Sequence, residues 1–290
     1  MAAVDAAAFT EVRGLRRQLR RTGVSVNSAL LYASLAWMAI VALAALIPGV
    51  LATDDPTVLD PARALQPPGA GTLLGTEQYG RSVATLLVHG ARSAMVIGLL
   101  ATTFGMLVGS VLGLIAGYLG GWVDMVIGRF IDMLMCFPGV LLALIIAAAL
   151  GSTTTNLILA VGIATVPGFA RVMRGQVLTV RGHLYVEAAR SNGFSPARTV
   201  FRHILPNALA PSVVMATVSI GVAIVVAASL SFLGLGPRTE VPDWGQLLSL
   251  GQPYLANSWW ISTFPGITLT LTVIAVSLLG DWLRDRLDVE

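Results

Sequence analysis

The sequence predicts an all-α integral membrane protein with six transmembrane helices. Of its 290 residues, 56% are hydrophobic and only 11% are charged, and the mean hydropathy is +0.80. A soluble domain devotes about a quarter of its residues to charge, so this chain lacks the surface chemistry that keeps a protein in water. The apolar residues are also gathered into long runs, which is typical of helices that cross a bilayer.

Six runs are long and apolar enough to cross about 30 Å of hydrocarbon as helices of about 20 residues. They are predicted at Ala29–Leu51, Ser93–Gly117, Met125–Leu150, Asn156–Met173, Ala208–Phe232 and Thr263–Leu283. The fourth is the shortest, because Arg171 lies near its end. We therefore expect one transmembrane domain over residues 29–290, preceded by a cytoplasmic segment at residues 1–28.

The first run has to be distinguished from a cleavable signal peptide. The arginines between positions 13 and 21 are typical of a basic n-region, and Val50-Leu51-Ala52 is an acceptable cleavage site. The apolar stretch is about 20 residues long, however, which exceeds the usual length of a signal h-region of about 7–15 residues. We therefore predict that this run remains in the protein as a transmembrane helix.

The placement of arginine predicts the orientation. Arginines gather before the first span and between the fourth and fifth spans, at Arg13, Arg16, Arg17, Arg20, Arg21, Arg171, Arg174, Arg181, Arg190, Arg198 and Arg202. The positive-inside rule places both chain ends and the loop at about residues 174–207 in the cytoplasm. Nucleic-acid binding would also explain a basic chain. A net charge of only +3 on so apolar a chain favours membrane orientation, so no nucleic-acid partner is expected.

The absence of lysine excludes two kinds of chemistry. All 18 basic residues are arginine. A P-loop needs a lysine that reaches the terminal phosphates, and a Schiff base needs a lysine amine, so the chain carries neither. The three histidines show no metal-ligand spacing, Cys136 is the only cysteine, and the H-E-x-x-H motif of metalloproteases does not occur. We therefore expect no catalytic residue, no metal site and no cofactor in this chain.

An ion-coupled secondary carrier is an alternative that the sequence leaves open. Such a carrier more often has ionisable residues at mid-membrane depth. Arg129 and Asp132 share one face of the third span, but they lie near its predicted cytoplasmic end. No span has a convincing carboxylate at its centre, which makes this alternative less favoured.

Glycine and proline predict how the helices pack. Gly105, Gly109, Gly113 and Gly117 recur every four residues in the second span. One face of that helix therefore has no side chains, and a neighbouring backbone can approach it closely. Pro138 and Pro167 lie within the third and fourth spans, where each removes a backbone donor and can kink its helix. Static packing is favoured over gating as the role of these kinks.

Two loops on the predicted outer side are too long to be simple connectors. They cover about residues 52–92 and 234–262, and the second contains Trp244, Trp259 and Trp260. An indole combines an apolar ring with a polar N–H group, which suits the membrane interface. We therefore expect these tryptophans to anchor the loop at the interface, in preference to contacting a ligand.

The cytoplasmic loop is predicted to form a helix, a turn and a second helix. The first helix covers about Tyr185–Ser191 and ends at Gly193, which can adopt the left-handed conformation of a helix end. Ser195 is a good N-cap and Pro196 fits the first helical position. Pro206 is expected to close the second helix before the fifth span begins. Two short helices rich in arginine suit a lever that another protein grips, although a solvated basic connector would explain the pattern equally well.

This loop resembles the E-A-A-x-x-x-G signature of the permease subunits of ABC importers. The matching residues are Glu187, Ala188, Ala189 and Gly193, followed by Ile204, Leu205 and Pro206. Leu74–Ser82 resembles the L-G-T-D-x-x-G-R-D stretch of the C-type subunit of the dipeptide/oligopeptide/nickel permeases, with Glu77 and Ser82 in place of aspartates. Leu230–Gly236 with Asp243-Trp244-Gly245, and the tail Gly280–Asp288, are similar to the same family.

The resemblance implies a fold, a location and a set of partners. The fold is that of a type I ABC importer permease, with six transmembrane helices and a cytoplasmic helix-turn-helix coupling loop. The location is the bacterial plasma (inner) membrane, with both termini in the cytoplasm. The partners are a homologous second permease subunit, one or two cytoplasmic ATPase subunits that bind ATP and Mg²⁺, and an extracytoplasmic substrate-binding protein. Peptides are the first expected substrate, and nickel or another small solute is the alternative.

The resemblance also implies two contact sites. The residues expected to dock the ATPase are Glu187, Ala188, Ala189, Arg190, Gly193, Arg198, Arg202 and Pro206. The residues expected to meet the substrate-binding protein are Gly75, Thr76, Glu77, Tyr79, Arg81 and Trp244.

Overall fold

The computed structural model describes residues 28–69 and 71–287 of the chain. The predicted N-terminal segment 1–28 therefore lies outside the described residues, except for Ser28. Within the described part, the elements are helices, and extended pairing is limited to two isolated antiparallel bridges, Gly69 with Thr72 and Thr76 with Ser82. Five helices are long and apolar enough to cross a membrane, and a sixth span is present if one bent pair of helices is counted as a single span. The prediction of an all-α membrane protein is confirmed.

The first span is interrupted by proline. Its helix is described over Ser28–Leu46, and the chain restarts as the short helix α2 (Pro48–Leu51) after a break at Ile47. Pro48 has no N–H group to continue the hydrogen-bond ladder, and its ring disfavours a helical conformation for the preceding residue. The predicted single helix Ala29–Leu51 is therefore two helices in the structure.

Helix α3 (Val83–Leu119) begins ten positions before the predicted second span at Ser93. Ser82 caps its first turn by accepting a hydrogen bond from the Thr85 backbone N–H at 3.5 Å. A helix of this length extends about 55 Å at 1.5 Å per residue, which is well beyond the hydrocarbon thickness of about 30 Å. The first turns of α3, which contain His89 and end at Arg92, were not predicted, because these polar residues interrupt the apolar run.

The third span is broken, which corrects the prediction of one helix over Met125–Leu150. Helix α4 (Gly121–Met135) and helix α5 (Gly139–Leu150) meet at a bend of 90°. Pro138 stands at the N-cap of α5 with an extended backbone, so the ladder of α4 cannot continue through it. Pro167, by contrast, lies inside the uninterrupted helix α6 (Thr154–Arg181).

Helix α6 packs along α3 through the glycine face. A Cβ atom added at Gly109 would lie 2.6 Å from the Val166 carbonyl oxygen, and one at Gly117 would lie 3.0 Å from that of Arg174. Gly105 and Gly113 come equally close to atoms of α6. Any larger side chain on this face would push the two helices apart.

The fifth span is continuous with the helix that precedes it. Helix α8 (Pro196–Thr199) passes through the π-helical turn η2 (Val200–Ile204) into helix α9 (Leu205–Phe232), so that one helix covers Pro196–Phe232. The prediction that Pro206 ends the second helix of the loop is wrong. Pro206 falls in the first turn of α9, where a missing N–H group is tolerated because the preceding residues already wind as a helix with wider turns.

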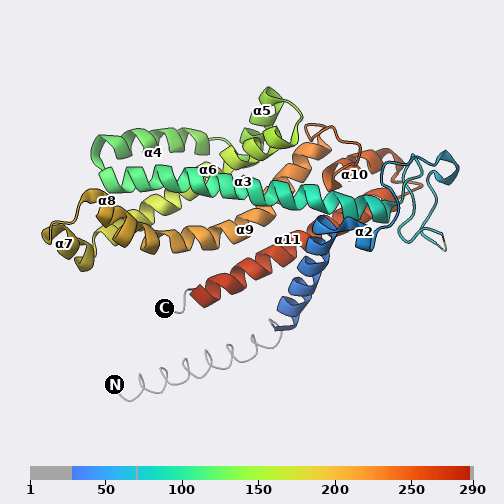
Figure 1. Cartoon of the computed structure of the whole chain (residues 1–290). Helices are drawn as coiled ribbons and strands as arrows, with labels where there is room; N and C mark the ends of the chain where they lie inside the picture. The colour runs from blue at the N-terminus through green and yellow to red at the C-terminus, as the bar shows by residue number, and fades with distance from the viewer. Residues whose placement is uncertain (1–27, 70, 288–290) are drawn as a thin grey trace, which may run out of the picture.

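The remaining elements complete two ends of an elongated bundle. Helix α7 (Leu184–Ser191) and α8 form what we call the basic tip, residues 182–204. At the opposite end lie residues 52–69, 71–82 and 233–259, which we call the loop cap; it contains α10 (Trp244–Gly251) and two short 3-10 helices. The last span is α11 (Trp260–Leu287). Figure 1 shows α3 running from the loop cap to the basic tip.

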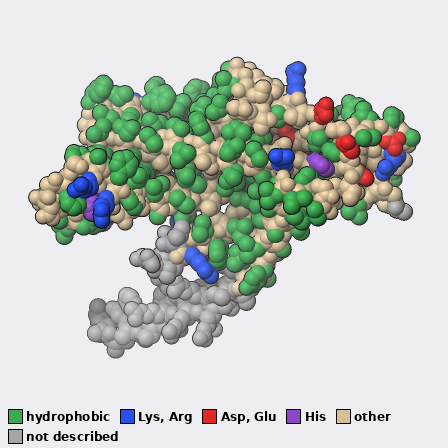
Figure 2. Space-filling model, viewed as in Figure 1, with side chains coloured by type: hydrophobic (Ala, Val, Ile, Leu, Met, Phe, Trp, Pro, Cys, Tyr) green, Lys and Arg blue, Asp and Glu red, His purple; other side chains and the backbone are tan. Residues whose placement is uncertain are grey.

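The surface between the two ends is apolar. Figure 2 shows arginine and histidine at the basic tip, acidic side chains gathered toward the loop cap, and apolar side chains on the face between them. Large apolar side chains such as Leu99, Leu107, Ile145 and Ile274 are about half exposed there. A continuous exposed apolar surface of this kind is unfavourable in water and suits lipid or a membrane partner.

Candidate functional site

The first half of the basic tip is helix α7 and the turn that ends it. Gly193 has φ = +78°, a left-handed conformation that glycine adopts at little cost. Its N–H group donates to the Arg190 carbonyl at 2.9 Å, and the Phe194 N–H donates to the Ala189 carbonyl at 3.2 Å. These two bonds form a Schellman motif, which fixes the direction of the chain as it leaves the helix.

The second half of the basic tip is joined rigidly to the membrane helix. The Ser195 hydroxyl accepts a hydrogen bond from the Arg198 backbone N–H at 3.4 Å, and Pro196 occupies the first turn, as the sequence predicts for a helix start. From Pro196 the helix continues without interruption into α9. A displacement of α8 is therefore transmitted directly to a transmembrane helix.

The basic tip has one buried side and one open side. Val186 and Ile204 pack with Met173 and Val177 of α6 in a small apolar core. On the opposite side, Leu184 is 82% exposed, Tyr185 44% and Phe201 68%. Exposed large apolar side chains on a polar loop indicate a surface that a partner covers. These three residues were not among the predicted site residues. The available signal was the occurrence of large apolar residues between the arginines of the loop.

Most of the predicted docking residues lie on the open side. Glu187, Ala188, Arg190, Gly193, Arg198, Arg202 and Pro206 are exposed, whereas Ala189 is buried. Three arginines against one glutamate leave this surface positively charged, so an acidic partner surface would be complementary.

Aromatic rings brace the two halves of the basic tip. The rings of His183 and Tyr185 stack at 5.6 Å, and those of Phe194 and His203 stack at 5.7 Å. The Arg198 guanidinium lies 5.5 Å from the Phe194 ring centroid, in the range of a cation–π contact. The Arg190 guanidinium lies 5.7 Å from the ring of Tyr118 on α3. Two of the predicted docking arginines are thus held in place by rings of the same chain.

Three arginines of the predicted loop belong to α6 instead, so the loop is shorter than residues 174–207. Arg171 Nη2 donates to Asp132 of α4 at 2.7 Å, and Arg174 binds Asp124 of the same helix through two contacts. Arg181 Nη1 donates to the carbonyls of Gly117 and Tyr118 at the end of α3. These arginines tie α6 to its neighbours. Asp132 is therefore paired with α6, and Arg129 on its own helix is exposed.

The loop cap encloses most of the residues predicted to meet a binding protein. Gly75, Thr76, Glu77, Arg81 and Trp244 are buried, and only Tyr79, at 49%, is exposed. Arg81 Nε donates to Glu77 at 3.1 Å and Arg81 Nη1 donates to the Glu240 carbonyl at 3.0 Å. The buried five therefore hold the loop cap together, and Tyr79 is the predicted contact residue whose side chain is available.

Two of the three tryptophans are core residues, which corrects their prediction as interface anchors. Trp244 is 1% exposed and Trp260 is 5% exposed, whereas Trp259 is 50% exposed. Their indole N–H groups donate to the Leu87 and Thr76 carbonyls at 2.9 and 3.1 Å. A buried indole needs such a partner, and here the partner is loop or helix backbone of the same chain.

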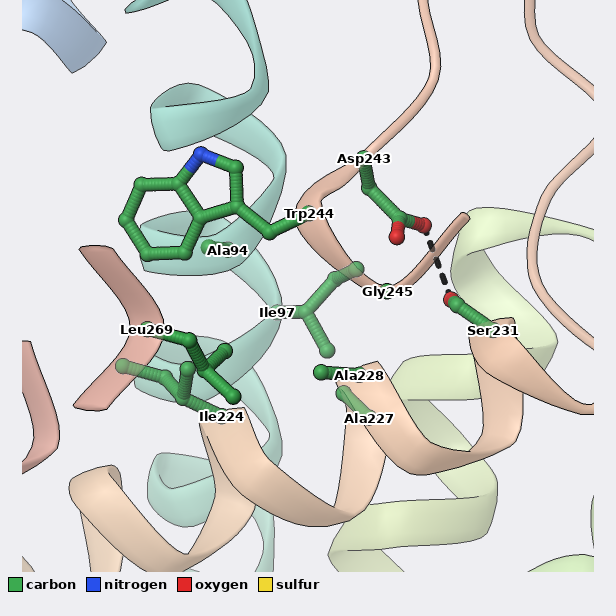
Figure 3. A pocket seen from close by; sticks show the side chains of 10 residues that line it. All are labelled: Ala94, Ile97, Ile224, Ala227, Ala228, Ser231, Asp243, Trp244, Gly245 and Leu269. Atoms are coloured by element: carbon green, nitrogen blue, oxygen red, sulfur yellow. Dashed lines mark hydrogen bonds between the residues drawn. The ribbon is translucent and has the colours of Figure 1, made fainter. Parts of the chain in front are cut away.

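A buried carboxyl completes the loop cap. The Asp243 side chain accepts hydrogen bonds from the Gln246 backbone N–H at 3.0 Å, as the N-cap of α10, and from the Ser231 hydroxyl at 2.8 Å. Figure 3 shows Asp243 directed at Ser231, with Trp244 beside α3. Burial raises the pKa of Asp243 above its ordinary value, although these hydrogen bonds act in the opposite direction.

Comparison with known proteins identifies the family. Residues 109–289 match the family of binding-protein-dependent transport system inner membrane components. A dipeptide transport system permease protein, DppC, of Alkalihalophilus pseudofirmus is 38% identical over 94% of this chain and 88% of its own length. This chain belongs to that family. The permease spans nearly the whole of this relative, so the similarity is not confined to one segment.

Further relatives and solved structures agree with this assignment. A di/tripeptide permease protein of Pseudomonas aeruginosa is 37% identical over 88% of the chain and 86% of its own length. A glutathione permease protein, GsiD, of Escherichia coli is 41% identical over 74% of the chain and 71% of its own length. An inward-facing MetNI methionine ABC transporter superposes with a TM-score of 0.56 at 19% identity, over 69% of this permease and 95% of that chain. The fold is therefore that of an ABC transporter permease of the inner membrane.

Proposed function

We propose that this permease forms one half of the membrane path of an ATP-driven importer of short peptides, and that its basic tip docks a separate cytoplasmic ATPase. The second half of the path is a homologous permease, one or two ATPase subunits bind ATP and Mg²⁺, and an extracytoplasmic protein delivers the solute. Peptide transport is supported by the relatives, which are named for dipeptides, di/tripeptides and glutathione.

The two-sided basic tip is the observation that carries the docking proposal. Leu184 and Phe201 expose most of their surface, and they lie among arginines on a short helix pair that is continuous with α9. An apolar core surrounded by charge is the usual composition of a protein interface. A partner that grips this surface moves α9 directly, which provides coupling between an ATPase and the membrane helices.

The orientation and the outer contact follow from the same arrangement. Arginine at the basic tip favours the cytoplasmic side, and this places the loop cap outside, where a binding protein docks. Because the other candidate residues are buried, Tyr79 and the loop backbone around it are the proposed contact with the binding protein.

The docking proposal is tested at the turn of the basic tip. Gly193→Val forces a β-branched residue into a left-handed conformation, whereas Gly193→Asn keeps a residue that tolerates it. Strain of about 1–2 kcal/mol corresponds to a loss of roughly tenfold in ATPase retention. The change should appear when the tagged complex is purified and peptide uptake is measured.

Arg202→Glu tests the charge on the same surface: it replaces an exposed cation by an anion, so it should weaken docking on an acidic partner and reduce both readouts. Gly193→Asn should resemble the natural permease in both. Natural levels of ATPase retention and uptake in both Gly193→Val and Arg202→Glu would contradict the docking proposal.

A further inference from the structure

A hollow lies at the elbow between α4 and α5. Its volume is about 470 Å³, within the range of about 300–1,000 Å³ that is typical of small-ligand pockets. Phe137 from the elbow, Pro167 from α6, and Met215 and Val222 from α9 give it apolar walls. The hollow lies where α4 and α5 diverge by 90°, and residues of both helices line it together with residues of α6 and α9.

An exposed ion pair joins α4 and α6 about one turn away from residues that line this hollow. On α6, Arg171 follows Pro167 by one turn; on α4, Asp132 precedes Met135 by one turn, and both Pro167 and Met135 line the hollow. Arg171 Nη2 and Asp132 Oδ1 are 2.7 Å apart, and each side chain is 57% exposed. An ion pair so exposed contributes little to stability, so a ligand that binds either charge can replace it at little cost.

We propose that the hollow and this ion pair together bind the transported solute, and that the solute is a short peptide with free termini. A peptide has one carboxylate and one ammonium group, which match the Arg171 guanidinium and the Asp132 carboxylate. Guanidinium binds carboxylate through two parallel hydrogen bonds, and the apolar walls accept an uncharged side chain. The inference rests on the proposed function, because it assigns the place where that function handles its substrate.

The residues of the walls determine how strongly the hollow selects among the side chains of a solute. Its polar wall residues are Thr165 and Ser219, and the Thr165 hydroxyl already donates to the Gly162 carbonyl at 2.7 Å. The side chain of the solute therefore meets mainly apolar contacts, which discriminate weakly between apolar groups of similar size. Recognition of the two termini with tolerance of the side chain suits a path that carries many peptides.

A second ion pair between the same helices provides the control. Asp124 and Arg174 also join α4 to α6, but their side chains are 20% and 40% exposed. Asp124 lies two turns before Asp132 and is therefore farther from the elbow, and neither Asp124 nor Arg174 is within one turn of a residue that lines the hollow. Neutralising this pair removes a similar helix-to-helix contact without changing the charges beside the hollow.

Cys136 provides the readout. It is the only cysteine of the chain, it is exposed, and it stands between Met135 and Phe137, which line the hollow. The assembled transporter, purified with its ATPase subunits, is treated with N-ethylmaleimide, and mass spectrometry measures the rate at which Cys136 is labelled. The probes are L-alanyl-L-alanine and the same dipeptide with an acetylated amino terminus and an amidated carboxyl terminus.

L-alanyl-L-alanine is expected to slow the labelling of Cys136 by about tenfold at about ten times its dissociation constant, as occupancy of one site requires. The blocked dipeptide should not slow it. The variant Asp132→Asn with Arg171→Gln should lose this protection, whereas Asp124→Asn with Arg174→Gln should keep it. ATPase retention shows that each variant is assembled.

Equal protection by both dipeptides, or protection by neither, would overturn this inference, and so would protection that survives in Asp132→Asn with Arg171→Gln. An assembled transporter without protection contradicts only the solute site. A natural chain that retains no ATPase contradicts the proposed function itself, so the two failures are distinguishable.

Discussion

The loop cap and the basic tip are built on opposite plans. In the loop cap, Glu77, Arg81, Trp244 and Trp260 are at most 9% exposed, and each makes a hydrogen bond within the chain, although Glu77 Oε2 is buried without a partner. In the basic tip, Leu184 is 82% exposed, and the predicted charged residues stand on the open side. The loop cap therefore pairs most of its polar side chains internally, whereas the basic tip leaves apolar and charged side chains exposed.

The difference separates two kinds of motif that look alike in the sequence. The stretch Gly75–Arg81 and the stretch Glu187–Gly193 both resemble family signatures, yet the first is mainly internal structure and the second is mainly surface. A substitution in the loop cap should therefore act on folding, and a substitution in the basic tip should act on docking. The predictions below test this separation, beginning with the largest expected change in stability.

Arg81→Met should have the largest effect on stability. It leaves the Glu77 carboxylate buried without its partner, which costs about 3–5 kcal/mol. The double variant Glu77→Gln with Arg81→Met removes both charges and should recover much of that loss. Thermal unfolding of the purified complex measures both variants. Equal stability of Arg81→Met and the natural chain would contradict the structural role of the loop cap.

Gly113→Val tests the seam that connects the two ends. The added side chain would collide with the Ala170 carbonyl on α6, and overpacking of this kind costs about 1–3 kcal/mol. Gly128→Val on α4 is the matched control, because nothing lies within 4 Å of its added Cβ. The midpoint of thermal unfolding should fall for the first variant only. A similar fall for both would show that the α3–α6 seam is not the cause.

Asp243 should give the loop cap a pH dependence. Because burial raises the pKa of this carboxyl in the folded state, the folded state holds the proton more tightly than the unfolded state. Stability should therefore fall as the pH rises from the unfolded pKa of about 3.9 through the raised folded pKa. Asp243→Asn keeps the N-cap and removes the titration, so its stability should not fall over that range.

Asp243→Ala distinguishes the effect of losing the N-cap from the effect of losing the negative charge. It loses the N-cap and the bond from Ser231, and loss of an N-cap costs about 1 kcal/mol. Unfolding midpoints measured across the acid range for the natural chain and both variants test these expectations. A natural chain whose stability rises with pH relative to Asp243→Asn would contradict the raised pKa.

Leu184→Ala with Phe201→Ala should have the smallest effect on stability. Both side chains are mostly exposed, and surface substitutions usually change the free energy of unfolding by less than about 0.5 kcal/mol. Retention of the ATPase should nevertheless fall by tenfold or more, because a loss of about 1.4 kcal/mol of interface energy is sufficient. A large loss of stability with unchanged retention would reverse the comparison between the two ends.

Hydropathy predicted the presence of the spans, because a helix in lipid requires a long run of apolar residues. Such a run can be recognised from the local sequence alone. It did not predict where α3 begins or where α6 ends, because these turns are stabilised by packing and by ion pairs with other helices, such as Arg171 of α6 with Asp132. A kink at Pro138 was anticipated, but a break of 90° into two helices was not. A proline permits a break, but the packing around it decides whether one forms, as the uninterrupted helix through Pro167 shows.

Site residues were predictable where the local chain determines them. Gly193 and Ser195 occupy the positions that helix-capping rules assign to them. The roles of Trp244 and Trp260 were not predictable, because the residue type alone does not distinguish a tryptophan at the membrane interface from one buried in the protein. Their partners, the carbonyls of Leu87 and Thr76, come from distant parts of the chain, and only the folded structure brings them together.

The most direct test of the account measures whether the basic tip is covered in the working complex. In a Cys136→Ser background, Leu184→Cys and Tyr79→Cys each place one thiol on the basic tip or on the loop cap. The account predicts that maleimide labelling at position 184 is at least about tenfold slower with the ATPase bound than after its removal, as a covered interface residue requires. Labelling at position 79 should not change. Equal labelling at position 184 with and without the ATPase would contradict the account.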